Sequence, residues 1–454
     1  MAHTLITHYR QCWIYIKKMG ENQMKAFNLG KKSIFLATIA FSSFTLLGSI
    51  GLTQNSAFAQ TKKEVSKPVT VTYWYWLDDP SQNTTQELIN KFNATHPGVH
   101  VVGRLIPSSN FQQTLINAAA SGSLPDTSRF HDWWVGQFAT NKLLAPLDSY
   151  RQHWAFNKDI AQRYWNTGKT GTNSPIYMIP NEYITFYLYY NKAMFSQAHL
   201  TPPKTFQQFQ TDAIKLTNPA KHRYGFAMRG GSGGQDQWFA FMLAGGAEMV
   251  NNQGNVVINS TKAVSINQWY INLFEKYKVA PPSAVTDSYA QLLADFENGT
   301  VAMFAHHIGS YSLLKQALGN KLGVIPLPQS NPKHPATLGS MNGNVIFNSS
   351  TNKAADWTWI SWLSSPAAIN ILDRSVNAQL PVLTSVAKEP YFQNQLAWKI
   401  AIDEESYATD WPPLPGVGAV SGHVWQQSMD QALLGQVSSK QMVDTIATAL
   451  QQSN

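Results

Sequence analysis

The stretch that decides the fold is IPNEYITFYLYYNKAMFSQAHLTPPKTFQQFQ, residues 179–210. Its segment from Thr185 to Tyr190 is aromatic and rich in residues that favour strands, so it predicts a buried strand. Pro202-Pro203 follows, and this pair cannot lie inside a helix. The pair therefore separates the strand from the element that comes next.

A helix is predicted directly after the proline pair. Thr205 and Gln208 have the spacing of a capping box, which marks a helix N-terminus. Three apolar residues are expected on the apolar side of this helix: Phe206, Phe209 and Ile214. Further along the chain Trp269 belongs to a longer amphipathic pattern, and we expect it in the core.

The segments that precede the deciding stretch alternate between strand and helix patterns. Residues 69–76 (VTVTYWYW) predict a first strand, and residues 99–105 predict a second. Between them Ser81 or Asn83 is suited to cap a helix. This β-α-β-α order implies a parallel sheet and an α/β fold. Later in the chain a further strand is predicted at Asn344–Phe347.

Charge gives no indication of a nucleic-acid partner. The chain has a formal net charge of +8, but residues 1–59 hold six Lys or Arg and one acidic residue, which leaves +3 for the rest. No basic stripe interleaved with aromatic residues is present in the body of the chain. We therefore expect no binding of nucleic acid.

Residues 1–59 predict an export leader. Three lysines precede an apolar run from Ser33 to Leu52, and Ala57-Phe58-Ala59 has the pattern of a cleavage site. A membrane anchor is the alternative, because the run has about the minimum length to span a bilayer. The run contains six Ser, Thr or Gly residues from Ser42 onward, which favours cleavage. We expect a leader over 1–59, a linker over 60–68, and a mature protein in the periplasm or cell exterior.

The one cysteine of the chain, Cys12, precedes the apolar run. The mature protein is therefore expected to have no disulfide, no thiolate chemistry and no cysteine metal site. A lipid-anchored form needs a cysteine directly after the run, so we expect a soluble form. The start codon stays open between Met1 and Met24.

The order of motifs from Val69 to Leu450 resembles the family 1 extracellular solute-binding proteins, the sugar-binding components of ABC importers, which include maltose-binding proteins. No single motif is specific, but their shared order over almost the whole mature chain is. The motifs are the strand-then-Trp start, Leu-Pro-Asp at 124–126, the deciding stretch at 179–210, Phe-Glu-Asn-Gly-Thr-Val-Ala-Met at 296–303, Val-Ile-Pro-Leu-Pro at 324–328, Leu-Pro-Val at 380–382 and Ala-Leu-Leu-Gly at 432–435.

This resemblance implies a two-lobe periplasmic-binding-protein fold of the type II-like class, with a hinge and a cleft between the lobes. The first lobe is expected over 69–182 with 344–405, and the second over 183–343 with 406–454. A carbohydrate ligand, an ABC permease in the membrane and a monomeric state are implied as well. No catalysis, no cofactor and no metal are expected.

Sugar binding has two physical needs that the sequence meets. Aromatic side chains stack on the apolar face of a sugar ring, and polar side chains pair with its hydroxyl groups. In open α/β sheets such residues lie at the carboxyl ends of strands, and fifteen Trp favour an oligosaccharide. This rule and the resemblance together select Trp76, Asp78, His131, Asp132, Trp133, Glu182, Tyr183, Asp236, Trp238, His306, Tyr311, Asn342 and Trp411, with His307 and His423 as further candidates.

Other readings of these residues stay open. Asp132 has the position of a helix cap, and His306 and His307 point to opposite faces of a strand, which argues against metal. Only Arg129 and Arg229 stand near the candidate segments, and the absence of an arginine cluster does not favour an anionic ligand.

A secreted glycosidase is one alternative function, because two of the candidate carboxylates could form a catalytic pair. A binding protein for a solute other than sugar is the other alternative.

Overall fold

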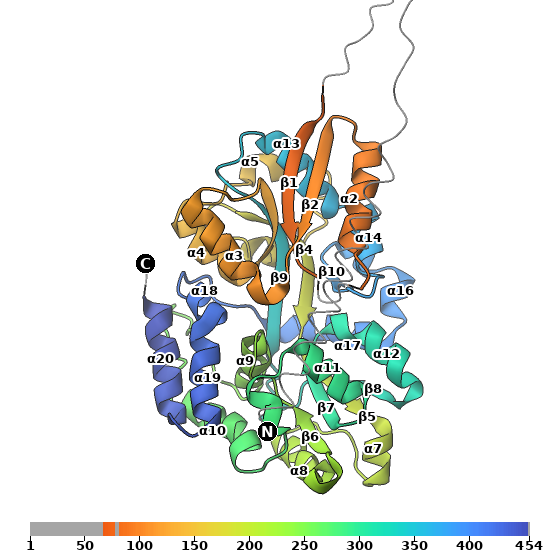
Figure 1. The fold of residues 1–454 in the computed structure, drawn as a ribbon, viewed down its shortest axis with the longest axis vertical. Coiled ribbons are helices and arrows are strands. Elements are labelled where there is room, and N and C mark those ends of the chain that lie inside the picture. Colours follow the sequence, from red (N-terminus) through yellow and green to blue (C-terminus); the bar gives the residue numbers. More distant parts are fainter. Residues whose placement is uncertain (1–66, 78–80, 453–454) are drawn as a thin grey trace, which may run out of the picture. The chain divides into compact units, whose positions relative to one another are not determined.

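The computed structural model describes residues 67–77 and 81–452, which belong to one compact unit. The predicted leader and Asp78 lie outside these residues. The described chain carries one sheet of seven strands and one of four, surrounded by helices (Figure 1), so the expected α/β class is confirmed. Within 67–77 and 81–452 no helix is both long enough and apolar enough to cross a membrane.

The first half of the seven-stranded sheet follows the sequence pattern. β1 (Val69–Tyr75) pairs in parallel with β2 (Val99–Leu105) and with β3 (Thr127–His131). The helix between the first two strands, α2 (Thr84–Thr95), is capped by Asn83, whose side chain accepts a hydrogen bond from the backbone of Gln86. The predicted parallel start is therefore confirmed, with Asn83 rather than Ser81 as the cap.

A long strand, β9 (Thr337–Ile346), joins the two halves of this sheet. It pairs antiparallel with β3 on one side and with β4 (Met178–Thr185) on the other. It begins seven residues before the predicted Asn344, because the polar segment ahead of that residue also finds strand partners. Two short strands complete the sheet: β10 (Leu380–Pro381) on β4, and β11 (Ala408–Thr409) beside β9.

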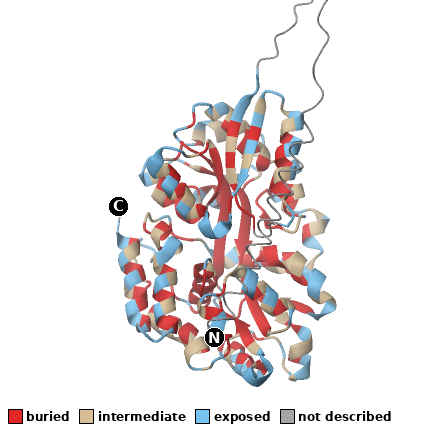
Figure 2. Cartoon of the chain, in the orientation of Figure 1, coloured by how far each residue is buried: buried red, intermediate tan, exposed pale blue. Residues whose placement is uncertain are grey.

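The four-stranded sheet is built around β5 (Tyr187–Asn191). This strand pairs antiparallel with β7 (Val301–His306) and with β8 (Leu322–Ile325). β6 (Tyr224–Ala227) pairs in parallel with the far side of β7. Every residue of β4, β7 and β9 is buried, and Figure 2 shows these strands as the interior of the described chain.

The passage between the two sheets takes a single residue, Phe186. The sequence predicts one strand from Thr185 to Tyr190, whereas the structure ends β4 at Thr185 and begins β5 at Tyr187. The strand divides because its two parts pair with different sheets. Phe186 itself stays bound to β9: its N–H donates to the carbonyl of Leu338, and its own carbonyl accepts from the Thr337 hydroxyl.

Helix α8 (Phe206–Leu216) begins where the sequence predicts. The Thr205 hydroxyl accepts a hydrogen bond from the backbone N–H of Gln208. The prediction for Ile214 is wrong, because its side chain is 41% exposed while Ala213 and Leu216 are buried. The buried positions follow Phe209 by four and seven residues, which keeps them on its side of the helix, whereas a spacing of five does not.

Trp269 lies at the edge of the core rather than inside it. It is half-buried on α10 (Thr261–Glu275) and stacks on Phe206 with ring centroids 4.0 Å apart. Its indole N–H donates to the Gln210 side chain at 3.0 Å. This partner satisfies the indole N–H while the ring packs on the core.

The remaining helices pack around the two sheets, and α9 is almost entirely buried between other elements. Their bounds are α3 (Ser108–Ser121), α4 (Asp132–Thr140), α5 (Asp148–Arg151), α6 (Gln162–Asn166), α7 (Lys192–Gln197), α9 (Gly234–Ala244), α11 (Tyr289–Glu297), α12 (Tyr311–Leu318), α13 (Lys353–Leu363), α14 (Pro366–Leu372), α15 (Thr384–Ala387), α16 (Pro390–Gln393), α17 (Leu396–Glu404), α18 (Val417–Ala419), α19 (Trp425–Leu433) and α20 (Ser439–Gln451).

Candidate functional site

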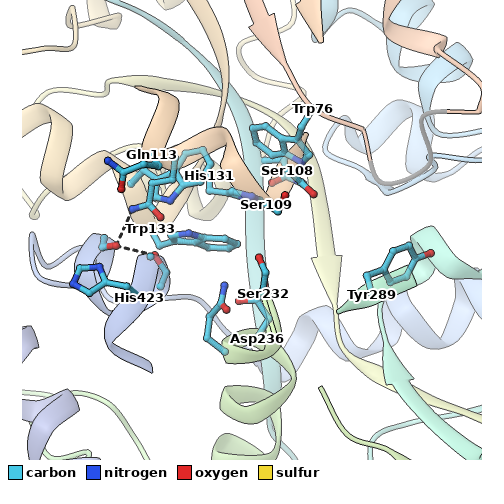
Figure 3. A pocket seen from close by; sticks show the side chains of 18 of the residues that line it. Trp76, Ser108, Ser109, Gln113, His131, Trp133, Ser232, Asp236, Tyr289 and His423 are labelled. Atoms are coloured by element: carbon cyan, nitrogen blue, oxygen red, sulfur yellow. Dashed lines mark hydrogen bonds between the residues drawn. The ribbon is translucent and has the colours of Figure 1, made fainter. Parts of the chain in front are cut away.

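A cavity of about 430 Å³ lies among elements of both sheets (Figure 3). One wall comes from the ends of β1 and β3 and from the first turns of α3 and α4. The other comes from the loop before α9, the start of α11, and residues at the end of β7. Residues 418–419 and 421–423 and Asn342 of β9 also line it. This volume is in the range of small-molecule sites in proteins.

Six of the thirteen selected residues line this cavity, and they come from five separate segments. Five of them follow or end a strand or begin a helix, and Asn342 lies within β9 between β3 and β4, so the fold brings them together although they are up to 266 positions apart in the chain. They are Trp76, His131, Trp133, Asp236, His306 and Asn342, joined by the further candidates His307 and His423.

Three of these residues form a stack of rings. The imidazole of His131 lies between two indoles, 3.9 Å from Trp133 and 4.4 Å from Trp76 between ring centroids. Burial, together with the charge of Arg129, holds the pKa of His131 well below its usual range. The imidazole is therefore neutral, so a charged ring does not interrupt the aromatic surface.

Glu182 does not line the cavity, but it helps to position the stack through Arg129. Its carboxylate lies 2.6 Å from the guanidinium of Arg129, and Glu182 is 1% exposed. The same guanidinium donates to the carbonyl of Trp76 at 2.9 Å and covers its ring at 4.5 Å. The buried ion pair thus fixes the position of Trp76.

Asp132 ties α4 to β9. Its carboxylate accepts hydrogen bonds from the backbone N–H of Trp133, from the Ser340 hydroxyl and from the backbone N–H of Met341, all between 3.0 and 3.1 Å. Burial raises its pKa well above the usual range. Asp132 does not line the cavity, but it holds Trp133 and the strand that carries Asn342.

The other selected residues also lie outside the cavity. Trp238 is fully buried and donates its indole N–H to Asn267 at 2.8 Å. The Tyr183 hydroxyl donates to Asp410 at 2.6 Å. Tyr311 is half-buried at the start of α12, and Asp78 is outside the described residues.

Trp411 contacts the cavity wall from the side. Its ring centroid lies 5.9 Å from that of Trp133 and 4.7 Å from that of Phe239. Its indole N–H donates to Oδ1 of Asp236 at 3.2 Å. Burial raises the pKa of Asp236 to about 7, against the opposing effect of Arg229. This carboxyl group is therefore only partly ionised at neutral pH.

His306 and His307 lie side by side in the second wall, and each is held by a hydrogen bond to its Nδ1. The backbone N–H of Gly309 donates to Nδ1 of His307, so the proton of the neutral ring sits on Nε2. Nδ1 of His306 shares a hydrogen bond of 2.7 Å with the Ser310 hydroxyl. Burial and the neighbouring His307 lower the pKa of His306 well below its usual range.

Sequence reasoning missed a polar group on α3. Ser108, Ser109, Gln112 and Gln113 all line the cavity. Nε2 of Gln112 donates to the carbonyl of Gly418 at 2.8 Å. The rule that ligand residues follow strand ends could have found them, because they come directly after the end of β2.

Comparison with known proteins gives the same fold. The family model described as "Bacterial extracellular solute-binding protein" matches residues 78–369. The maltotriose-binding protein of Pyrococcus abyssi is 24% identical over 373 residues, which cover 80% of this chain and 77% of that protein. A multiple sugar-binding protein of Streptococcus mutans is 24% identical over 323 residues, 66% of this chain and 73% of that protein.

Solved structures agree. An ABC transporter solute-binding protein of Thermotoga lettingae, bound with α-D-tagatose, superposes with a TM-score of 0.77 at 24% identity and covers 84% of this chain and 98% of its own. Maltose-bound MalE3 of T. maritima gives a TM-score of 0.75 at 21% identity, with 84% and 99% covered. Because the family model matches more than half of the chain, this protein belongs to the bacterial extracellular solute-binding protein family.

Proposed function

We propose that this protein binds a carbohydrate in the cavity and delivers it to an ABC permease, without chemical change. The observation that carries the proposal is an aromatic surface, formed by Trp76 and Trp133, that shares one cavity with a wall of hydrogen-bonding groups. A sugar ring needs both. The sugars named for the tagatose-bound, maltose-bound and maltotriose-binding relatives support the same ligand class.

The residues proposed to touch the sugar are those that line the cavity. The ring of Trp133 is suited to pack on it, supported by His131 and Trp76 in the same stack. Asp236, Asn342 and His307 are suited to pair with its hydroxyl groups. Residues 69–182 and 183–343 are proposed as the cores of two lobes that close on the ligand. The protein is further proposed to be an exported monomer, which N-terminal sequencing of the secreted protein and its sedimentation would test.

A thermal-shift panel of mono- and oligosaccharides tests the proposal. A ligand that binds only the native state raises the melting temperature by mass action, so at least one sugar should do so in a concentration-dependent manner. Amino acids and short peptides serve as controls. A panel in which only non-sugar solutes stabilise the protein would overturn the proposal, and breakdown of a bound oligosaccharide during incubation would favour the glycosidase.

A further inference from the structure

We propose that the protein has a second ligand site, separate from the sugar cavity, that takes an apolar molecule with one carboxylate, such as a medium-chain fatty acid or an aromatic acid. The site is a cavity of about 650 Å³ lined by residues around Pro202-Pro203, by residues from the end of β8 onward, and by Tyr407. The described residues that line it are all different from those of the sugar cavity, and it is the larger of the two. Its volume lies in the range of small-molecule sites in proteins.

The lining of this second cavity is mostly apolar. Eight of its twelve described residues are apolar or aromatic: Ile325, Leu327, Tyr407 and five prolines, at positions 202, 203, 326, 332 and 335. The last three of these prolines are exposed. Proline adds rigid apolar surface and no N–H donor. Apolar surface that stays accessible in a folded protein commonly marks a binding site, and here it forms the walls of a cavity.

These walls are held in place without a ligand. The backbone N–H of Gln329 donates to the carbonyl of Lys204, and its carbonyl accepts from the N–H of Phe206, both at 3.1 Å. The Nε2 of Gln329 donates to the carbonyls of Leu327 and Ala336 at 2.7 and 3.0 Å. Its Oε1 accepts from the N–H of Ala336 at 3.0 Å. A cavity whose walls are already ordered binds its ligand at a lower entropy cost.

The same hydrogen bonds occupy the polar atoms of the more buried lining residues. Both polar ends of the Gln329 side chain are paired, and the Tyr407 hydroxyl is bonded to Glu404. The backbone N–H of Leu327 donates to Oε1 of Glu404 at 3.1 Å. Water in this part of the cavity has few polar partners, so its displacement by an apolar group is favourable. The inner part of the ligand should therefore be apolar.

The polar groups that remain in the lining include two donors at the start of α8. The backbone N–H of Lys204 donates to Oε1 of Gln208 at 2.8 Å, which brings these two residues together. Nζ of Lys204 and Nε2 of Gln208 form no hydrogen bond with the described residues, and both residues are exposed. Two donors, one of them cationic, match a carboxylate at the outer end of the ligand.

The charge around the cavity complements such a group. The lining segments 201–208 and 325–335 contain two lysines and no acidic residue. Residues 403–405 are acidic, but none of them lines the cavity. Burial raises the pKa of Glu404 well above its usual range, and Glu405 is in an ion pair. The cavity therefore favours an anionic ligand group over a cationic one.

Calorimetric titration of the protein with apolar acids tests this inference. The probes are octanoate and 4-phenylbutyrate, each beside the alcohol with the same carbon skeleton, together with acetate. At least one of the two acids should bind, about ten-fold or more tightly than its alcohol, the gain expected for hydrogen bonds to a charged group. Acetate should not bind measurably, because it lacks the apolar part.

Two variants locate the site. Thr201→Trp fills the cavity from an exposed lining position and should weaken the binding of acid and alcohol alike by at least about ten-fold. Lys204→Gln should weaken acid binding about ten-fold and change alcohol binding by less than about three-fold. Lys215→Gln, at an exposed position of α8 outside the cavity, is the matched control and should change neither. All three variants should bind sugar as the wild type does.

Three results would overturn the inference. The first is that neither acid binds, or that an acid binds equally well to wild type and Thr201→Trp. The second is an alcohol that binds as tightly as its acid, which would remove the carboxylate from the assignment. The third is a concentration-dependent dimer, seen by sedimentation and lost in Thr201→Trp, which would assign the apolar lining to a second copy of the chain. None of these results depends on sugar binding, so the proposed function is tested separately.

Discussion

Trp133 shows how one side chain can serve both the core and the ligand site. It is only 5% exposed, with His131 stacked on its ring and Trp411 nearby. Packing of this kind keeps the indole in one rotamer, so a ligand would meet a surface that is already ordered. Such preorganisation lowers the entropy cost of binding.

Replacement of Trp133 by Ala should weaken sugar binding by about 1–3 kcal/mol through lost stacking and burial. The control is Trp238→Ala, because Trp238 is fully buried and does not line the cavity. That variant should lose about 3–5 kcal/mol of stability but bind sugar normally while folded. Titration calorimetry and urea denaturation measure the two effects, and normal affinity in Trp133→Ala would place this residue in the core alone.

Asp236 should make stability depend on pH. Burial raises its pKa from 3.8 to about 7 in the folded state, so the folded protein holds this proton more tightly than the unfolded chain. Stability from this source is full below about pH 4 and is lost as pH rises toward and through 7. Asp236→Asn should therefore gain about 1–3 kcal/mol relative to wild type between pH 4.5 and 8, discounted for cavity water. Urea denaturation at each pH measures this, and a constant difference would contradict it.

Elements are positioned by contacts that sequence patterns do not reveal. The pattern rules located Trp76, His131 and Trp133 at the cavity because strand ends and helix starts are local features. The same rules predicted that Glu182 lies at the ligand site. Its carboxylate is instead buried against Arg129, which is 53 positions away in the chain. The prediction put Ile214 on the buried side of α8 because it relied on three apolar residues. The packing of the folded protein buries Ala213 and Leu216 instead.

The carboxylate of Asp132 links α4 to β9 through its hydrogen bonds, so its removal should weaken the contact between these two elements. Asp132→Ala removes the acceptor for three donors at once, so it should cost about 1–3 kcal/mol in stability and also weaken sugar binding through Trp133. Ser340→Ala removes only one of these hydrogen bonds and should be the milder variant. Thermal denaturation and sugar titration provide the measurements. Equal losses of stability and of sugar affinity in the two variants would mean that the Asp132 carboxylate does not link α4 to β9.

For the molecule as a whole, the sequence predicted the α/β class and the family, since these depend on the order of many motifs. The boundaries between the proposed lobes are still a prediction. The cavity takes residues from elements of both sheets. A sugar that contacts both walls gains contacts only when they are close together, and this difference is what can shift a population toward a closed form.

The cognate sugar should therefore make the protein more compact. Small-angle X-ray scattering with and without sugar should show a smaller radius of gyration in the bound state, as expected for hinge closure. A solute that fails in the thermal-shift panel is the control and should leave the radius unchanged. Tight sugar binding with no change in radius would indicate a rigid pocket and would return attention to the glycosidase alternative.

The one-residue passage at Phe186 bears on how the protein resists proteolysis. A protease needs several residues of extended, accessible chain in its active site, and nicking concentrates at exposed loop tips. Phe186 is 1% exposed and is hydrogen-bonded to β9 through both its N–H and its carbonyl. Cleavage at this passage would first require local unfolding, so the two sheets should remain covalently joined through it for as long as the protein stays folded.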